Sequence, residues 1–385
     1  MRATKSGDFV LRTGLALVFA STLGTASVHA ADKLLAEAVD FTGTFIYLGA
    51  KPPALVIGAI RNGETVVRGF GEISDGSGKE PDGDTLMRVG SITKAFCGAT
   101  FASMVADGSV NFTDRLQDRL GWDVKILERD GKSIRLIDLA THASGLPREA
   151  DVKAVGDNPT MMGGKEDYIA SLTTDVLLFA PGTGILYSNF GFDLLAQALA
   201  NAAGKPYADL LKERVLDPAG LKDTHFDLSE ADQARAMQGR NFDGSPLPFI
   251  DTAPMIQGAG GLYSTANDML RWLSWHLDRF ATKDAELRLL NHASYLHRDG
   301  LDPVYGMDEG GVMDSMGLGW VVVEPEGPRP LILAKSGGLQ GEFSYVAFAP
   351  SRGVGVFVSI NAFSVEGFDA MSKAAIELIT ELAPR

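Results

Sequence analysis

Cysteine is nearly absent from this chain of 385 residues: Cys97 is the only one, so no disulfide can form within the chain. Basic residues are also scarce, since 35 Lys and Arg stand against 49 Asp and Glu, and no segment concentrates them. Phosphate binding needs clustered Lys and Arg, so nucleic acid is not expected as a partner. No apolar run approaches the roughly 18–20 residues that a membrane span requires.

The composition that remains is that of a globular protein. Apolar residues make up 45% and charged residues 22%, which is enough apolar surface for a sizeable core. The 44 glycines and 17 prolines follow no fixed period, so disorder and fibrous repeats are excluded. At about 150 residues per domain, the length predicts two domains or one large α/β unit with an insertion.

The N-terminus has the pattern of a signal peptide. Arg2, Lys5 and Arg12 precede an apolar, small-residue stretch at 13–27, and a small-x-small pattern ends at Ala30. We expect export and a cut near Ala30, which would remove three positive charges and one negative and take the net charge from −14 to about −16. An exported protein with one cysteine points to a bacterial periplasm or to secretion, and we expect the periplasm. The alternative is an amphipathic start to the fold.

Strand-like segments occur at both ends of the chain and helical patterns in the middle. Asn62-Gly63 joins two apolar runs and predicts a hairpin, since both turn positions need positive φ. Helices are expected at 91–106, 134–142, 188–203, 205–215, 266–280 and 366–383, and strands at 54–60, 65–70, 317–324, 330–335, 342–349 and 353–360.

This order predicts an α/β (α+β) fold with one mostly antiparallel sheet built from both chain ends. Strands at the start and end, with helices between, cannot form sequential βαβ units, so the sheet must be flanked by helices and interrupted by a helical subdomain. The predicted parts are a signal peptide at 1–30, the N-terminal part of the α/β domain with the helix that begins at 91 (31–110), a mainly helical subdomain (111–310) and the C-terminal part of the α/β domain (311–385).

One serine motif remains after other catalytic signatures are searched for. The chain has no G-x-S-x-G elbow, no metal-ligand spacing and no phosphate-loop pattern, so neither a metal nor a cofactor is expected. Ser91 and Lys94 form the only S-x-x-K and lie one helical turn apart, so the amine can reach the hydroxyl. A neighbouring base activates serine as a nucleophile, and burial can lower the pKa of lysine for that task. Alone, the motif also fits an N-capping serine with a surface lysine.

Two further motifs follow Ser91 and Lys94 in the sequence. Tyr187 and Asn189 form the only Y-x-N, suited to proton transfer and to binding a substrate amide, or to loop packing and helix capping. Lys335-Ser336-Gly337 ends a predicted strand, where a lysine and a hydroxyl can bind a carboxylate and glycine admits the substrate backbone. The three motifs in this order are far more specific than any one.

In these motifs the sequence resembles the serine β-lactamase and low-molecular-weight penicillin-binding protein superfamily, in its class C-like branch. The segments 139–147 and 260–272 are similar to stretches typical of that branch. The segments 146–149, 187–189, 192–195 and 198–201 resemble the AmpH-type D-alanyl-D-alanine carboxypeptidase/endopeptidases, periplasmic enzymes of peptidoglycan remodelling. Ser336 stands where threonine is usual, and it keeps the hydroxyl.

The resemblance implies an acyl-serine mechanism on peptidoglycan stem peptides, with β-lactams as further ligands. Ser91 would attack the peptide carbonyl, and Lys94 and Tyr187 would share the proton transfers. The backbone N–H groups of Ser91 and Gly338 would form the oxyanion hole. The remaining substrate contacts would come from Asn189, Lys335, Ser336, Gly337 and Gly338.

Other functions use the same residues. A class C-like β-lactamase would differ only in how fast the acyl-enzyme is hydrolysed. A carboxylesterase of the same fold is a further alternative, and Lys335 counts against it because a simple ester substrate has no carboxylate for that cation to bind. A penicillin-binding sensor or peptidoglycan-binding module would not need the full set. His142, Cys97 and the tryptophans Trp272 and Trp275 are expected to be structural, and Arg148 with Glu149 is expected to be a solvated loop pair.

Overall fold

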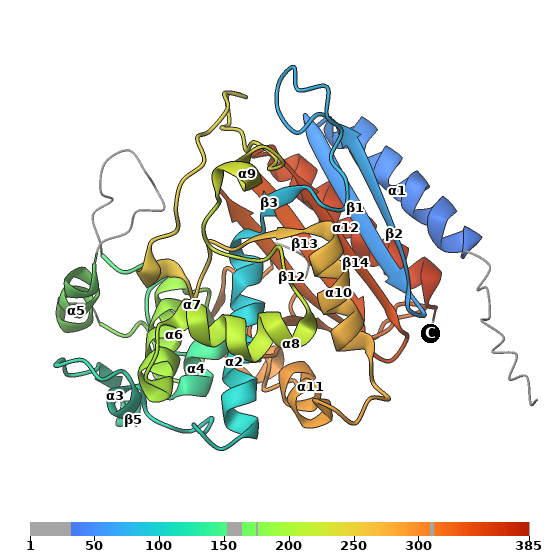
Figure 1. Ribbon diagram of the computed structural model, residues 1–385. Coiled ribbons are helices and arrows are strands. Elements are labelled where there is room, and N and C mark those ends of the chain that lie inside the picture. Colours follow the sequence, from blue (N-terminus) through green and yellow to red (C-terminus); the bar gives the residue numbers. More distant parts are fainter. Residues whose placement is uncertain (1–31, 152–163, 175, 309–311, 385) are drawn as a thin grey trace, which may run out of the picture. The chain divides into compact units, whose positions relative to one another are not determined.

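The computed structural model describes residues 32–151, 164–174, 176–308 and 312–384, so the predicted signal peptide lies outside the described residues. An eight-stranded sheet in the order β2-β1-β14-β13-β12-β11-β10-β8 forms its centre (Figure 1). Every pair of neighbours in this sheet is antiparallel, and strands from both chain ends adjoin where β1 pairs with β14. The predicted α/β architecture is confirmed.

The elements have the following bounds. The strands of the large sheet are β1 Ala54–Arg61, β2 Glu64–Gly71, β8 Leu296–His297, β10 Ser315–Met316, β11 Val321–Val323, β12 Ile332–Leu339, β13 Glu342–Ala349 and β14 Val354–Ile360. Short pairs are formed by β3 Leu86–Arg88 with β7 Tyr263–Thr265, β4 Glu128–Arg129 with β5 Lys132–Ser133, and β6 Ile185–Leu186 with β9 Val304–Tyr305. The helices are α1 Lys33–Ala50, α2 Thr93–Ala106, α3 Leu116–Arg119, α4 Leu136–Ala140, α5 Lys165–Thr174, α6 Asn189–Ala203, α7 Tyr207–Leu211, α8 Asp217–Ala219, α9 Glu230–Gln233, α10 Ala266–Leu277, α11 Ala285–His292 and α12 Val365–Leu382.

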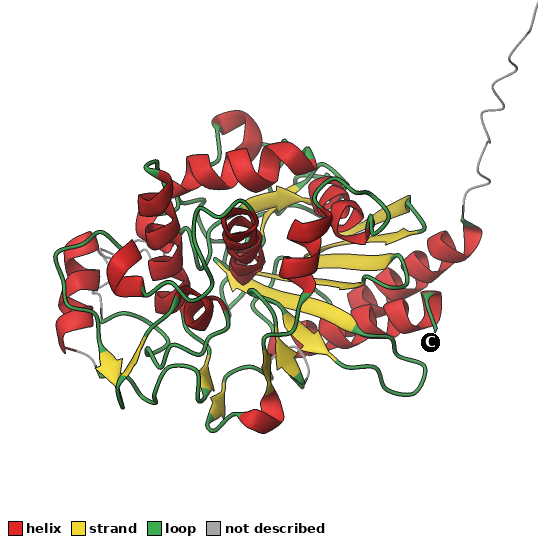
Figure 2. Cartoon of the chain, turned by 90° about the horizontal axis from the view of Figure 1, so that it is seen from below, coloured by secondary structure: helices red, strands yellow, loops and turns green. Residues whose placement is uncertain are grey.

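Helices cover both faces of the sheet (Figures 1 and 2). Successive side chains of β1 point to opposite faces of the sheet, so this strand contributes to the core on both faces. Leu55 and Ile57 belong to the core cluster that also contains side chains of α1 and α12, whereas Val56 and Ile60 belong to the cluster shared with α2, α6 and α10. Because both faces are buried, the strand is a nearly continuous apolar run.

The predicted Asn62-Gly63 hairpin is present between β1 and β2. Asn62 has a φ of 52° and Gly63 a φ of 85°, the left-handed conformations that this pair supplies at low cost. Arg61 pairs with Glu64 at the end of the ladder, so the turn fixes the register of the whole hairpin.

Helix α1 is not among the predicted elements. Asp32 caps it, accepting a hydrogen bond from the backbone N–H of Leu35 at 3.1 Å. Its outward face carries Phe41, Phe45 and Leu48, which are 73%, 60% and 65% exposed. These exposed apolar side chains blur the alternation of apolar and polar faces by which an amphipathic helix is identified.

Several predicted boundaries are wrong. The helix expected at 91–106 begins as a 3-10 turn, Gly90–Ile92, before α2; the helix expected at 134–142 is only α4; and the one expected at 205–215 is divided into α7, a π-helical segment at 212–216 and α8. The strand expected at 330–335 continues to Leu339, because β12 and β13 form a tight hairpin in which Gly338 pairs with Phe343. Gly337 and Gly338 lower the strand propensity of this segment, so its strand conformation is recognised only from the pairing with β13.

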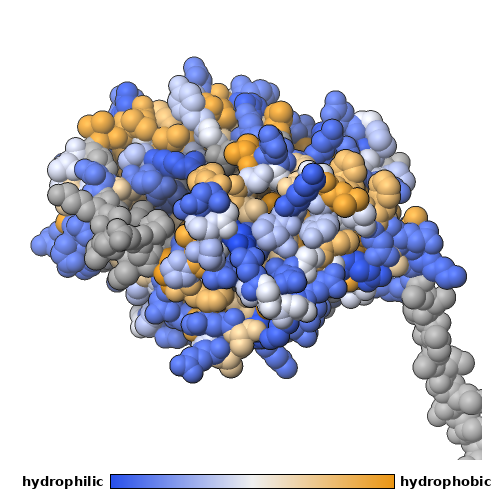
Figure 3. Space-filling view, turned by 90° about the horizontal axis from the view of Figure 1, so that it is seen from above, coloured by the Kyte–Doolittle hydropathy of each residue, from blue (hydrophilic) through white to orange (hydrophobic). Residues whose placement is uncertain are grey.

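Within the described ranges, no helix combines the length and the apolarity needed to cross a bilayer. The face of the molecule shown in Figure 3 is mostly hydrophilic, and its apolar side chains lie in several separate patches.

Candidate active site

Ser91 lies in the 3-10 turn between β3 and α2, and the backbone of this turn packs closely against β12. Gly90 has a φ of +52°, and a Cβ there would lie 2.6 Å from the backbone nitrogen of Gly338. A Cβ on Gly337 would in turn lie 2.0 Å from the carbonyl oxygen of Val89. Only glycine permits this approach, which brings the turn that carries Ser91 against the end of the sheet.

Lys94 is completely buried one turn after Ser91. Its Nζ donates to Asn189 Oδ1 at 2.6 Å and to the carbonyl oxygen of Ala259 at 2.7 Å, and it lies 3.1 Å from Ser91 Oγ. The amide and carbonyl oxygens can only accept, whereas the serine hydroxyl can also donate. A neutral Lys94 can therefore donate to these two oxygens and still accept a hydrogen bond from Ser91.

The pKa of Lys94 is lowered to about 7, mainly because burial disfavours the charged amine. The negative charges of Asp193 and Glu149 oppose this shift, and the positive charge of Arg148 adds to it. A substantial fraction of Lys94 is thus neutral near pH 7, as a general base requires.

Tyr187 lies among three cationic side chains. Lys94 Nζ is 4.9 Å, Lys335 Nζ 5.3 Å and Arg148 Cζ 4.7 Å from the centre of its ring. His142 stacks on the same ring with centroids 4.5 Å apart. The electron-rich face of the ring attracts the cations and brings the Lys94 and Lys335 motifs to one point.

Asn189 is the first residue of α6. Ser188 caps this helix by accepting a hydrogen bond from the backbone N–H of Gly191 at 2.9 Å. The Asn189 amide donates to Glu149 Oε1 at 2.5 Å while its oxygen accepts from Lys94. These two contacts fix the orientation of the amide.

The Lys335 motif lies on β12. Lys335 is 5% exposed, and its Nζ donates to the carbonyl oxygen of Ser336 at 2.9 Å. Ser336, Gly337 and Gly338 follow along the same strand, paired with Tyr345, Ser344 and Phe343 of β13. The three motifs found in the sequence thus come from separate elements and meet in space.

A cavity of about 200 Å³ opens beside these groups. It is lined by Gly90, Ser91, Glu149, Asn189, Asp193, Ile256, Ala259, Gly260, Gly338 and Leu339. Sequence reasoning gave no role here to Asp193 or Ala259, and it interpreted Glu149 as a solvated partner of Arg148. Asp193 could have been suspected from its place one turn after Asn189, but nothing in the sequence marks Ala259.

The other residues weighed in the sequence have structural surroundings. His142 is buried, and its Nδ1 accepts from the backbone N–H of Ser188 at 3.0 Å. Burial lowers the pKa of His142 well below its usual value, and raises the pKa of the Cys97 thiol to about 12. A neutral imidazole and a protonated thiol both suit a packed core.

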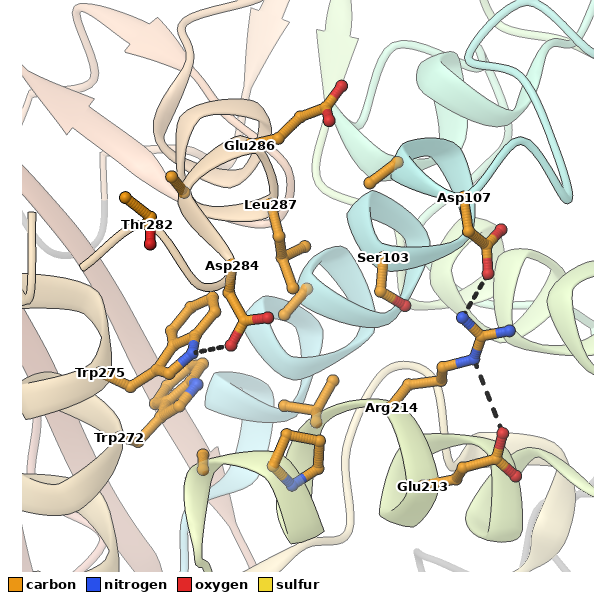
Figure 4. A pocket seen from close by; sticks show the side chains of 16 residues that line it. Ser103, Asp107, Glu213, Arg214, Trp272, Trp275, Thr282, Asp284, Glu286 and Leu287 are labelled. Atoms are coloured by element: carbon orange, nitrogen blue, oxygen red, sulfur yellow. Dashed lines mark hydrogen bonds and ion pairs between the residues drawn. The ribbon is translucent and has the colours of Figure 1, made fainter.

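A second cavity, of about 470 Å³, borders the other end of α2 (Figure 4). Trp272 and Trp275 line it, and the indole N–H of Trp275 donates to Asp284 Oδ2 at 3.2 Å. None of the predicted site residues lines this cavity, whereas Ser91, Asn189 and Gly338 line the smaller one. Among the described residues, no group of three or more His, Cys, Asp or Glu side chains is placed to hold a metal.

A serine hydroxyl 3.1 Å from a buried lysine, beside an antiparallel sheet covered by helices, is the arrangement of a serine hydrolase with the β-lactamase/transpeptidase-like fold. The beta-lactamase family model matches residues 32–381, and the chain belongs to this family.

Alignments with named relatives cover most of the chain. The sequence is 34% identical over 376 residues to the D-alanyl-D-alanine-carboxypeptidase/endopeptidase AmpH of Escherichia coli K12, covering 95% of this chain and 96% of the relative. It is 25% identical to a beta-lactamase of Pseudomonas fluorescens, over 80% of this chain and 88% of that protein. Among solved structures, the beta-lactamase/D-alanine carboxypeptidase of Yersinia pestis aligns with a TM-score of 0.83 and 33% identity, over 91% of this chain and 98% of that one.

Proposed function

We propose that the protein is a periplasmic serine DD-peptidase, a D-alanyl-D-alanine carboxypeptidase/endopeptidase that acts on peptidoglycan stem peptides and binds penicillins. The observation that carries this proposal is the set of contacts of Lys94: its Nζ lies 3.1 Å from Ser91 Oγ and donates to two oxygens that can only accept. The names of the Escherichia coli and Yersinia pestis relatives support the substrate class.

Acylation begins when Ser91 Oγ attacks the carbonyl carbon of the D-alanyl peptide bond. Neutral Lys94 takes the hydroxyl proton, and the carbonyl oxygen becomes an oxyanion that accepts from the N–H groups of Ser91 and Gly338. Each such donor contributes roughly 3–4 kcal/mol in other acyl-transfer enzymes. The tetrahedral intermediate then collapses and the C–N bond breaks. Tyr187 gives its phenolic proton to the leaving amine and takes the proton that Lys94 received from Ser91.

Recognition of the leaving residue depends on the lysine and hydroxyl of β12. A D-alanine at the C-terminus carries a carboxylate, which Lys335 and Ser336 bind by charge-assisted hydrogen bonds. Asn189 binds the amide on the acyl side. Gly337 admits the substrate backbone to the strand.

Deacylation requires that water replace the departed amine. Tyr187 relays a proton from that water to neutral Lys94 as the water attacks the ester carbonyl. The bond between the carbonyl carbon and Ser91 Oγ then breaks, and Lys94 returns the proton to Ser91 Oγ. The chemistry uses the side chains and backbone of this chain without a metal or organic cofactor.

A β-lactamase is the second candidate, because the Pseudomonas fluorescens relative carries that name and the same residues would acylate with a β-lactam. The two activities differ in the rate of deacylation. A carboxylesterase is a third candidate, and the buried Lys335 beside Tyr187 argues against it because a simple ester has no carboxylate to bind.

The test is release of D-alanine from a stem pentapeptide that ends in D-Ala–D-Ala. We expect release by the wild-type protein and none above background by Ser91→Ala. A wild-type protein that hydrolyses benzylpenicillin rapidly and leaves the pentapeptide intact would instead be a β-lactamase. Hydrolysis of p-nitrophenyl acetate alone would assign it to the esterases.

A further inference from the structure

Asp193 is a buried carboxylate that the proposed reaction does not use directly. It is 2% exposed and lies on α6 four residues after Asn189, so both side chains project from the same side of that helix. Its Oδ1 accepts from the backbone N–H of Ala259 at 3.0 Å, and its Oδ2 accepts from the hydroxyl of Tyr168 on α5 at 2.8 Å. Two donors on one carboxylate favour its ionised form.

Ala259 connects this carboxylate with Lys94. Its N–H donates to Asp193, and its carbonyl oxygen accepts from Lys94 Nζ at 2.7 Å. The preceding residue, Gly258, packs so closely on α6 that a Cβ would lie 2.2 Å from the carbonyl oxygen of Phe192. The glycine-rich segment 258–261, which matches no phosphate loop, therefore has a structural explanation: it holds a lysine acceptor against α6.

The charges around Lys94 come from several elements. Burial has the largest effect on the pKa of Lys94 and lowers it. Among the charges, the negative charge of Asp193 has the largest effect, and it raises that pKa. Burial raises the pKa of Asp193, whereas the positive charge of protonated Lys94 and the hydrogen bonds from Tyr168 and Ala259 lower it, so the charged amine and the carboxylate stabilise each other in one desolvated site. The titratable or charged groups that face or adjoin Lys94 are Cys97 on α2, His142, Arg148 and Glu149 after α4, Tyr187 and Asp193 around α6, and Lys335 on β12.

We propose that Asp193 is a positioning residue for Lys94: its carboxylate, held by Tyr168, fixes the Ala259 carbonyl on the amine and supplies negative charge to it. This inference rests on the proposed role of Lys94 as the base that activates Ser91. It assigns Asp193 and Tyr168 no contact with the reacting atoms.

The test is the pH dependence of Ser91 labelling by a fluorophosphonate, followed by intact mass. In this reaction Ser91 Oγ forms a bond to phosphorus, fluoride leaves, and Lys94 takes the serine proton, so neither a peptide nor a β-lactam is needed. Asp193→Asn keeps the shape and removes the charge. We expect the midpoint of its acid limb to move to lower pH by about one unit, because loss of the anion lowers the pKa of Lys94.

Three further variants separate charge from structure. Tyr168→Phe removes a donor that favours the carboxylate, so its midpoint moves in the same direction by less. Asp193→Ala also removes the acceptor of the Ala259 N–H, and we expect it to lower the plateau rate as well. Tyr295→Phe is the matched control, since it deletes a tyrosine hydrogen bond of the same 2.8 Å length, to Leu290, and should leave the midpoint unchanged.

An unchanged midpoint in Asp193→Asn would overturn the inference, even if the plateau rate fell. If Asp193→Asn did not fold, Tyr168→Phe would decide the question by the same criterion. Labelling with the expected shift, but no reaction with pentapeptide or penicillin, would reject the proposed function and keep the role of Asp193. A wild-type protein that the fluorophosphonate did not label at all would overturn both.

Discussion

At the scale of single residues, the site depends on one buried amine. The Nζ of Lys94 contacts two oxygen atoms that can only accept and one hydroxyl, that of Ser91, that can also donate, and the side chain is shielded from water. The spacing of Ser91 and Lys94 can be read from the sequence because it is local to one helical turn. The contacts with Asn189 and Ala259 cannot, because they join residues 95 and 165 positions apart.

The first prediction concerns pH. If Lys94 must be neutral to accept the serine proton, acylation is fast above its pKa of about 7 and is lost as the pH falls below it. We expect the second-order rate constant for acylation by benzylpenicillin to be about tenfold lower at pH 6 than at pH 8, measured by quenched intact mass. A rate that is flat over this range, or that rises toward low pH, would contradict the assignment of Lys94 as the base.

The second prediction separates carboxylate recognition from the chemistry. Lys335→Ala should raise KM for the pentapeptide by about 10–100-fold, the value of one hydrogen bond to a charged group. The rate with p-nitrophenyl acetate, which has no carboxylate, should change much less. Lys373→Ala, an exposed lysine on α12 that pairs with Glu377, serves as the control and should leave both rates unchanged. Equal losses with both substrates would remove Lys335 from carboxylate binding.

At the scale of elements, the two-residue turn was more predictable than the ends of strands and helices. The Asn62-Gly63 hairpin was identified because its chemistry is contained in two residues. The extent of β12 was not, because Gly337 and Gly338 are held in the strand by β13 and by close contact with the turn that carries Ser91. Helix α1 was missed because Phe41 and Phe45 are apolar but exposed, so the sequence does not show one apolar and one polar face.

The third prediction compares two glycines. Gly63 has a φ of 85°, so Gly63→Ala should lower the free energy of unfolding by about 1–2 kcal/mol. Gly49 lies within α1, and a Cβ added there would meet no atom within 4 Å. Gly49→Ala should therefore raise the free energy of unfolding by up to about 1 kcal/mol. Urea unfolding of both variants measures the difference. The same sign for both would show that backbone conformation does not govern these positions.

At the scale of the whole molecule, the order of strand-like and helical segments was sufficient to predict the sheet. Two strands at the start and several at the end have no economical arrangement except a common antiparallel sheet, and β1 does pair with β14. The limits of the helical subdomain, 111–310, stay a prediction. The edge strand β8, at Leu296–His297, belongs to the large sheet although it lies inside that range.

The fourth prediction concerns the N-terminus. Expressed in a Gram-negative host, the full chain should be recovered from the periplasm without residues 1–30, beginning at Ala31. Intact mass and N-terminal sequencing measure the cut, and Ala30→Trp, which places a large residue at the expected cleavage site, should retain the precursor. Mature protein that begins at Met1 in the cytoplasm would contradict both the signal peptide and the proposed location.

The most direct test of the central claim is an intact-mass time course of the mature protein with benzylpenicillin, followed by peptide mapping. We predict a covalent adduct on the peptide that contains Ser91, persisting for minutes or longer, and none in Ser91→Ala. An adduct on another residue, or neither adduct nor loss of the drug, would contradict the account of Ser91 as the nucleophile of a penicillin-binding peptidase. Rapid loss of the drug with little standing adduct would keep Ser91 and replace the peptidase with a β-lactamase.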